Sequence, residues 1–270
     1  MLARSAATLA AIGALLVLAP AGALAVNVGG DLGALSAHPA GCPATNAGYC
    51  SLLQTQIGGK PVAIPFDGKI TSFAVAVFAN TPPPAKGISL DTYVPTSFGN
   101  VRVGGAGPFA VPLAPGVHRF ATTVPVRTGQ LVGVTLPRTA ALAPICCIAA
   151  RHSASATVEK WWLGLPGSVP YDGVANDELL FSVDVRRPPD TQITSVQVGA
   201  HEATFGFQAL RKATGFRCAL AKVGVAPSFK SCTTPKTYSS LASGDYIFRV
   251  RAFNAIGADP TPAKRSFRIG

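Results

Sequence analysis

Glycine and proline are too frequent in this chain for long helices to form. The 270 residues include 28 Gly and 23 Pro but only one Met, and Glu and Lys are few. Glycine and proline are the two least favourable residues in a helix interior, and few strong helix formers are present to offset them. Short strands joined by turns accommodate both residues, so the sequence predicts an all-β fold.

Apolar residues alternate with polar ones along several stretches of the first two thirds of the chain. A period of two is typical of a strand that buries one face. Turns such as Asp67-Gly68 and Pro115-Gly116 separate the stretches. About eight strands are expected over residues 50–187, which favours a jelly-roll-like β-sandwich. The alternating apolar positions are Phe73, Val75, Val77, Val132, Val134, Leu136, Leu179, Phe181, Val183 and Val185.

A domain boundary is predicted at Arg186-Arg187-Pro188-Pro189-Asp190. Proline lacks the N–H that a ladder requires, so two prolines in a row cannot continue a central strand. Residues 26–187 would form one β-sandwich domain and residues 188–270 a second. Strict alternation in the second domain predicts its core, namely Ala203, Phe205, Phe207, Phe216, Cys218, Leu220, Tyr246, Phe248, Val250 and Ala252.

Residues 1–25 have the composition of a signal peptide. Arg4 supplies a positive start, residues 9–18 are apolar, and Ala23-Leu24-Ala25 is a small-residue cleavage signature. The apolar stretch is shorter than the roughly 20 residues that a membrane span needs. No cysteine follows the expected cut to accept a lipid, and residues 268–270 include no hydrophobic tail. We therefore expect a secreted, extracellular or cell-envelope-associated protein without a transmembrane anchor.

Six cysteines in an exported chain favour disulfides over metal thiolates, because that compartment is oxidising and no Cys-x-x-Cys spacing occurs. Cys218 and Cys232 are isolated in the second domain and are expected to pair. Cys42 and Cys50 are the nearest pair among the other four, which would leave Cys146 and Cys147 as neighbours. A crossed pairing is the alternative, and the spacing does not choose between them.

The end of the second domain carries a spaced motif, Tyr238-x-x-Leu241-x-x-Gly244-x-Tyr246-x-Phe248-x-Val250-x-Ala252-x-Asn254-x-x-Gly257. The motif resembles the end of a fibronectin type III or related immunoglobulin-like domain. Tyr246 would then be the corner tyrosine, whose hydroxyl bonds to the chain before its strand. Further matching segments are Pro189-Asp190-Thr191, Phe216-x-Cys218, Cys232-Thr233 and Pro260-Thr261-Pro262-Ala263.

These segments resemble an immunoglobulin-like repeat of large exported proteins from high-GC Gram-positive bacteria, and the resemblance also implies the pairing of Cys218 with Cys232. The first domain is similar to an uncharacterised β-sandwich of such proteins. Its matching segments are Gln54-Thr55-x-x-Gly58, Pro65-Phe66-Asp67-Gly68-x-Ile70-Thr71, Val126-x-x-Gly129 and Glu178-Leu179-Leu180-Phe181. The resemblance implies location and fold and brings no catalytic residues.

Positive charge is concentrated in the second domain. Residues 188–270 carry 11 basic and 4 acidic side chains, net +7, whereas residues 26–187 carry 11 and 8, net +3. In a fibronectin-like strand order, outward parity would place five cations on one sheet face: Arg217, Arg249, Arg251, Lys264 and Arg268. The alternative is an ordinary solvated face of a basic protein.

Such a face would attract wall teichoic acids, extracellular anionic polysaccharide, lipid headgroups or extracellular DNA through its summed field. The expected partners are a cell-wall or extracellular polysaccharide or another surface protein. Specific nucleic-acid recognition is not expected, because no recognition helix is present and export removes the chain from the genome.

Trp161 and Trp162 suggest a second binding hypothesis. Consecutive strand residues face opposite sides, so one indole could lie exposed near Tyr171 and stack on a sugar ring, as in a carbohydrate-binding module. The alternative is that both pack under the following loop. Asp172, Asn176, Asp177 and Glu178 offer oxygen ligands for calcium, but their spacing matches no EF-hand.

No motif predicts catalysis, a cofactor or a metal site. The four histidines lack His-Glu-x-x-His spacing, and no Gly-x-Ser-x-Gly sequence occurs. We expect a non-catalytic binding or structural protein of the cell surface, with a carbohydrate-binding module as the alternative and a hydrolase as the least favoured class.

Overall fold

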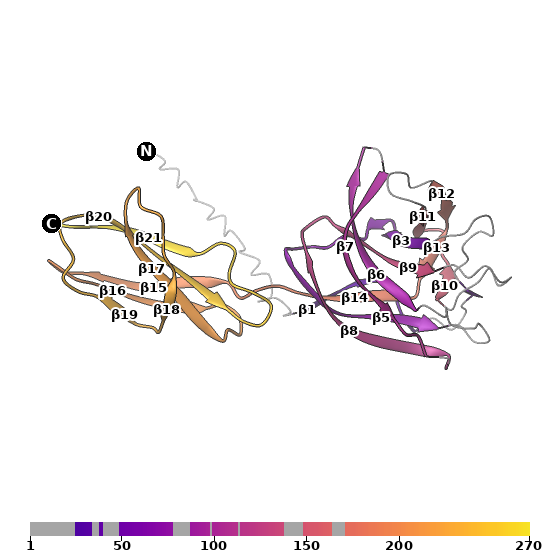
Figure 1. The fold of residues 1–270 in the computed structure, drawn as a ribbon, viewed down its shortest axis with the longest axis horizontal. Helices are drawn as coiled ribbons and strands as arrows, with labels where there is room; N and C mark the ends of the chain where they lie inside the picture. Colours follow the sequence, from indigo (N-terminus) through magenta and orange to yellow (C-terminus); the bar gives the residue numbers. More distant parts are fainter. Residues whose placement is uncertain are drawn as a thin grey trace, which may run out of the picture.

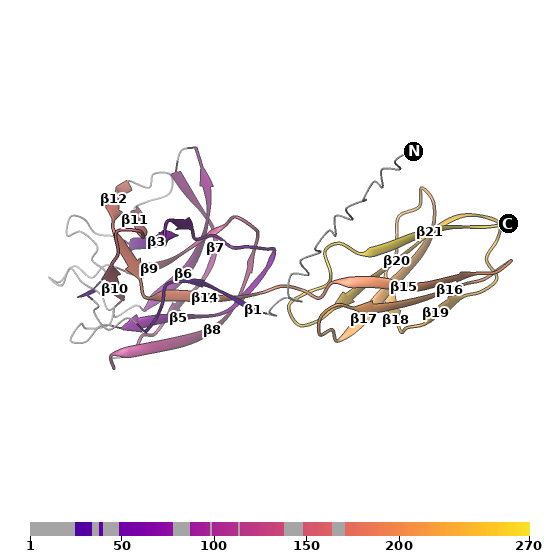
Figure 2. The same ribbon diagram turned by 180° about the vertical axis from the view of Figure 1, so that it is seen from behind.

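The computed structural model describes residues 25–33, 38–39, 49–77, 87–97, 99–112, 114–137, 148–163 and 171–270, without the side chains of residues 38, 39, 49, 137, 160–163 and 171–174. Every regular element in these ranges is a β-strand, so the predicted all-β class is confirmed. Within them, no helix is long and apolar enough to cross a membrane. Figures 1 and 2 show two groups of sheets joined by the segment after β14 (Phe181–Arg186).

The first group is built on two main sheets. One has the order β1 (Ala25–Gly29), β14, β5 (Gly68–Val77) and β8 (Gly116–Val126). The other has the order β12 (Tyr171–Ala175), β11 (Thr157–Leu163), β3 (Tyr49–Ile57), β9 (Leu131–Pro137), β6 (Ile88–Thr96) and β7 (Gly99–Phe109), with β4 (Lys60–Pro61) paired to β3. A small sheet has the order β13 (Asp177–Leu179), β10 (Ala149–His152) and β2 (His38–Pro39).

The core of the first group lies between its sheets and consists of alternate strand residues. All of the alternating apolar positions predicted for this part of the chain are buried. Phe73 lies at the centre, with its ring centroid 4.9 Å from those of both Phe109 and Phe120. Ala25, predicted as the last residue of the signal peptide, begins β1 opposite Arg186, and residues 1–24 lie outside the described ranges.

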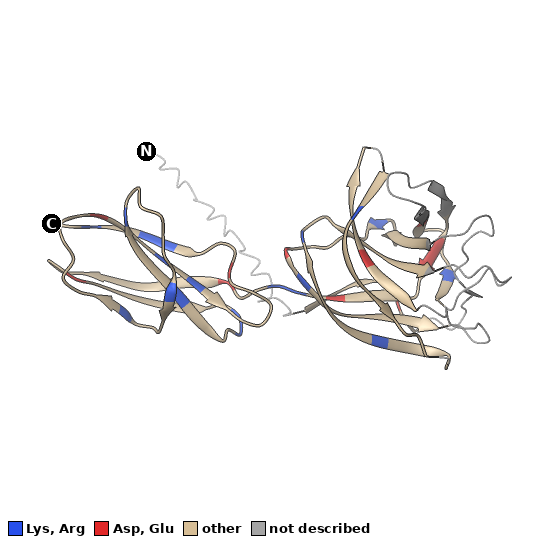
Figure 3. Ribbon diagram, in the orientation of Figure 1, with Lys and Arg blue, Asp and Glu red and all other residues tan. Residues whose placement is uncertain are grey.

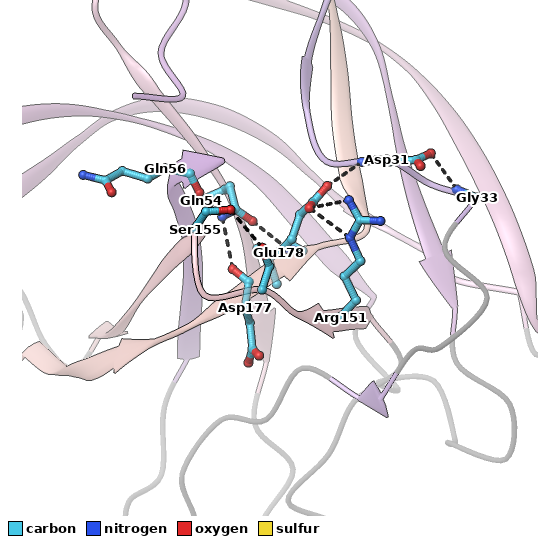
Figure 4. A network of polar contacts seen from close by, with 10 residues as sticks. Asp31, Gly33, Gln54, Gln56, Arg151, Ser155, Asp177 and Glu178 are labelled. Atoms are coloured by element: carbon cyan, nitrogen blue, oxygen red, sulfur yellow. Dashed lines mark hydrogen bonds and ion pairs between the residues drawn. The ribbon is translucent and has the colours of Figure 1, made fainter. Parts of the chain in front are cut away.

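A buried glutamine joins three strands of the first group. Gln54 of β3 has no exposed surface, yet its amide is fully hydrogen-bonded. Its Nε2 donates to the carbonyl oxygens of Gln56, Thr157 and Asp177 at 2.7, 3.0 and 3.2 Å, and its Oε1 accepts the N–H of Leu179 at 2.6 Å. These bonds tie β3 to β11 and β13 (Figure 4).

A buried ion pair lies beside this glutamine. Glu178 is 3% exposed, and Arg151 donates to its Oε2 from Nε at 2.9 Å and from Nη2 at 2.6 Å. The main-chain N–H of Asp31 donates to Oε1 at 2.9 Å (Figure 4). The segments that begin at Gln54 and Glu178, far apart in the sequence, therefore meet at one place.

The other two segments of the first-domain resemblance also meet. Asp67 Oδ1 accepts the main-chain N–H of Thr128 at 2.8 Å and its hydroxyl at 3.1 Å. These hydrogen bonds lower the pKa of the Asp67 carboxyl below its usual value. Both pairs of segments thus have a structural role in this fold.

A second polar network lies on the face of the large sheet that points away from the main core. Tyr93 donates to Ser51 Oγ at 2.9 Å, and Thr135 donates to Asp91 Oδ2 at 2.5 Å. Arg102 donates to Asp91 Oδ1 at 2.7 Å from Nε. Burial raises the pKa of the Tyr93 hydroxyl, and the bond to Asp91 raises the pKa of Arg102.

The second group consists of two sheets packed face to face. One has the order β15 (Thr191–Val198), β16 (Ala203–Ala209) and β19 (Lys236–Tyr238). The other has the order β18 (Lys230–Cys232), β17 (Gly215–Lys222), β20 (Gly244–Phe253) and β21 (Ala263–Ile269). Phe205 and Phe248 stack across the two sheets with ring centroids 4.0 Å apart. All of the predicted core residues are buried or partly buried.

Two specific predictions for this group are confirmed. Cys218 and Cys232 form a disulfide that links β17 to β18. The Tyr246 hydroxyl donates to the carbonyl oxygen of Ala242, before its strand, at 2.9 Å. Cys50 is also disulfide-bonded, but Cys42, Cys146 and Cys147 lie outside the described ranges, so its pairing stays a prediction.

We expect Gln54→Leu to destabilise the protein because it leaves the Leu179 N–H and the carbonyls around it without a partner. An orphaned buried polar group costs about 1–3 kcal/mol. Urea unfolding of the oxidised protein measures the loss, with the exposed neighbour Gln56→Leu as the control. Equal stability of the two variants would show that the buried amide is not a structural link.

We expect Cys218→Ala/Cys232→Ala to lower the free energy of unfolding, because the disulfide closes a loop with a sequence separation of 14. A loop of this size stabilises by about 3 kcal/mol in the chain-entropy model. Chemical unfolding of the double variant is measured without reductant, so that the disulfide of Cys50 stays intact and only the loss of the Cys218–Cys232 bond is detected. Unchanged stability would contradict the expectation.

Candidate functional site

The strand register of the second group brings four of the five predicted cations together. Arg217 on β17 lies directly opposite Arg251 on β20, and Arg249 on β20 lies opposite Lys264 on β21. Figure 3 shows basic residues along the strands of this sheet. We call Arg217, Arg249, Arg251 and Lys264 the cationic face.

No carboxylate balances the cationic face in the part of the chain that the structure describes. Two ion pairs are found among residues 188–270, Arg211 with Asp190 and Arg268 with Asp245. Arg268, predicted to belong to the stripe, therefore lies opposite an acidic residue at the other end of β20. Like charges directly opposite each other in a sheet are destabilising, so this arrangement works against folding.

Two aromatic rings hold guanidinium groups on this face. The Cζ of Arg251 lies 4.1 Å from the ring centroid of Phe229, and that of Arg217 lies 5.1 Å from the centroid of Phe253. Cation–π contacts of this kind orient a guanidinium while leaving its N–H groups available. Phe253 lies at the next alternate position of β20 after Arg249 and Arg251, so the alternation of the strand could have placed its ring on the same face. Phe229 lies in the connection before β18, where no period applies.

Two guanidinium nitrogens on the cationic face lack an acceptor. Arg249 Nη1 and Arg251 Nε are both buried, and neither has a hydrogen-bond partner among the described residues. An unsatisfied buried donor is costly, more so on a charged group. An anion on this face would relieve the repulsion between the opposed cations.

For Trp161, Trp162 and Tyr171, the candidate sugar-stacking residues, the structure describes the strand register of the backbone. Trp161 lies opposite Ser51 on one side and Tyr171 on the other, and Trp162 lies opposite Cys50. The register therefore brings Trp161 and Tyr171 together. Their side chains lie outside the described part of the structure, so stacking on a sugar stays a prediction.

The described residues contain no group of three or more His, Cys, Asp and Glu side chains that could hold a metal ion. Glu178, considered as a calcium ligand, is occupied by Arg151 and the Asp31 N–H. A cleft of about 590 Å³ between the two groups of sheets is lined mostly by apolar side chains and includes Asp67, whose carboxyl binds Thr128.

Comparisons with known proteins give no family. No protein-family model and no curated protein matches the sequence. Among solved structures, the chain is similar to a β-D-glucuronidase from Dictyoglomus thermophilum, with a TM-score of 0.24 and 11% identity over 83% of this chain and 37% of that chain. The chain thus spans less than two thirds of that enzyme's length. Similarity this low supports no statement about fold or activity.

Proposed function

We propose that the protein is an exported, non-catalytic binding protein of the cell surface or extracellular matrix. It consists of an N-terminal jelly-roll-like β-sandwich, residues 26–187, and a C-terminal fibronectin type III or immunoglobulin-like domain, residues 188–270. The second domain binds anionic polymers through the cationic face, and the first presents loops to a further partner.

The strand order of the second group supports the fibronectin-like assignment. That resemblance predicts that the strands holding Phe216, Tyr246 and the last residues lie side by side, and β17, β20 and β21 are neighbours in this order. The hydrogen bond of Tyr246 to Ala242 fits a corner tyrosine.

The absence of any counter-charge on the cationic face is the observation that carries the binding proposal. Four cations in two adjacent cross-strand pairs have no acidic partner among the described residues, although two other arginines of the same domain do. A feature that breaks a local stability rule without internal compensation is typical of a functional site. The chemistry that compensates it is a polyanion.

Such binding would depend on the summed field and on release of counterions from the polymer, with little dependence on sequence or stereochemistry. Secreted and cell-wall polymers that carry phosphate or uronate groups meet this requirement. An exported protein would encounter them directly.

We expect Arg217→Gln/Arg249→Gln/Arg251→Gln to bind long-chain polyphosphate and purified Gram-positive cell walls more weakly than the natural protein. The magnitude of the slope of log K against log salt should fall by about 2–3, because each of the three lost phosphate contacts removes about 0.7–0.9. Glutamine keeps much of the apolar stem on the aromatic rings, so packing changes little.

The matched control, Lys60→Ser/Arg119→Ser/Lys212→Ser, removes the same charge from exposed positions outside the cationic face. It should retain the affinity and the salt slope to within experimental error. If both triple variants lose binding equally, net charge alone is responsible and the cationic face is not a site.

A further inference from the structure

The last strand leaves one edge of its sheet unpaired. β21 ends the order β18-β17-β20-β21, and none of the described strands pairs with its outer side. β15, the end strand of the facing sheet, lies close by, and a groove of about 560 Å³ separates the two edges. The pairing of β15 with β16 shifts between Ile193 and Ser195, so β15 is an interrupted edge and β21 a regular one.

Backbone hydrogen bonds show which residues of β21 face outward. Asp245 accepts a bond from Val223 on the β17 side, and Ala252 accepts one from Asp259 on the opposite side. Because successive residues of a strand direct their backbone groups to opposite sides, residues 246, 248 and 250 face β21. Their register partners Phe267, Arg265 and Ala263 complete that ladder.

The backbone N–H and C=O groups of Lys264, Ser266 and Arg268 consequently point away from β20. None of the three makes a backbone hydrogen bond beyond the sheet ladder within the described chain. Such a row of free groups is a template for an added strand.

The charges along this edge select its occupant. Lys264, Arg265 and Arg268 are exposed, Arg268 even though it lies 3.9 Å from Asp245. Arg265 lines the groove with the hydroxyl residues Thr194 and Ser195. A second copy of β21 would bring cations against cations, which disfavours self-pairing. A strand with carboxylates at those positions would instead form favourable cross-strand pairs.

We propose that β21 binds an extended acidic segment of a partner protein as an additional strand. The segment has carboxylates four positions apart, opposite Lys264 and Arg268, and short hydroxyl side chains at alternate positions facing the groove. The two sites share Lys264. This one depends on the backbone groups of the strand edge, whereas the polyanion site depends on Arg217, Arg249 and Arg251 of the sheet face, so each can fail without the other.

The test is fluorescence polarisation of a labelled ten-residue peptide alternating Glu and Thr, with a Lys and Thr peptide as the charge-reversed control, on the full oxidised chain. Ser266→Pro removes one edge-facing N–H but no bond to β20, and proline is tolerated at such edge positions. We expect at least about tenfold weaker peptide binding for Ser266→Pro and less than about twofold for Ser266→Ala, because only proline lacks the N–H.

Amide chemical shifts of the natural protein give a readout that does not depend on the folding of the proline variant. Addition of the acidic peptide should shift the N–H signals of residues 264, 266 and 268 more than those of Arg265 and Phe267. Arg217→Gln/Arg249→Gln/Arg251→Gln should retain peptide binding.

Absence of binding by the acidic peptide would overturn the proposal. So would binding that Ser266→Pro leaves intact and the triple arginine variant abolishes, because that result assigns the peptide to the cationic face as a simple polyanion.

Discussion

The stacking of Phe205 on Phe248 fixes which residues of the second group point inward. With ring centroids 4.0 Å apart, the two side chains lock the facing sheets together. Because the side-chain period of a strand is two, burying Phe248 and Val250 forces Arg249 and Arg251 onto the outer face. The same packing that stabilises the sandwich therefore concentrates its positive charge, and the cationic face is a consequence of the core.

The core residues of this group were predictable from the sequence, because they follow the strict alternation of apolar and polar residues along each strand. Cys218 with Cys232 and the hydroxyl bond of Tyr246 were also expected and are present. Arg268 lies on β21 at the same parity as Lys264, as expected, but its ion pair with Asp245 could not be predicted, because it depends on the register between β20 and β21. Phe229 was missed because it lies in the connection before β18, where side chains follow no strand alternation.

The first group shows a different limit of sequence analysis. Gln54 is a polar residue in a buried position, and its role depends on the carbonyls of Thr157 and Asp177 from two distant segments. The network of Tyr93, Asp91, Ser51 and Thr135 likewise forms only where β6, β3 and β9 meet. Local patterns predict which residues are apolar and buried, whereas buried polar links depend on the assembled topology. Two of the segments that resemble exported sandwich proteins, those beginning at Gln54 and Glu178, contribute to these links.

We propose that an external polyanion compensates the opposed cations of the second group. The most direct measurement is the melting temperature of the natural protein at low salt, with and without long-chain polyphosphate, compared with the same pair of melts for Arg217→Gln/Arg249→Gln/Arg251→Gln. A ligand that binds only the folded state raises its stability. We expect the polyphosphate to raise the melting temperature of the natural protein and to change that of the variant little. Equal rises in both proteins would show that the polyanion does not bind the cationic face.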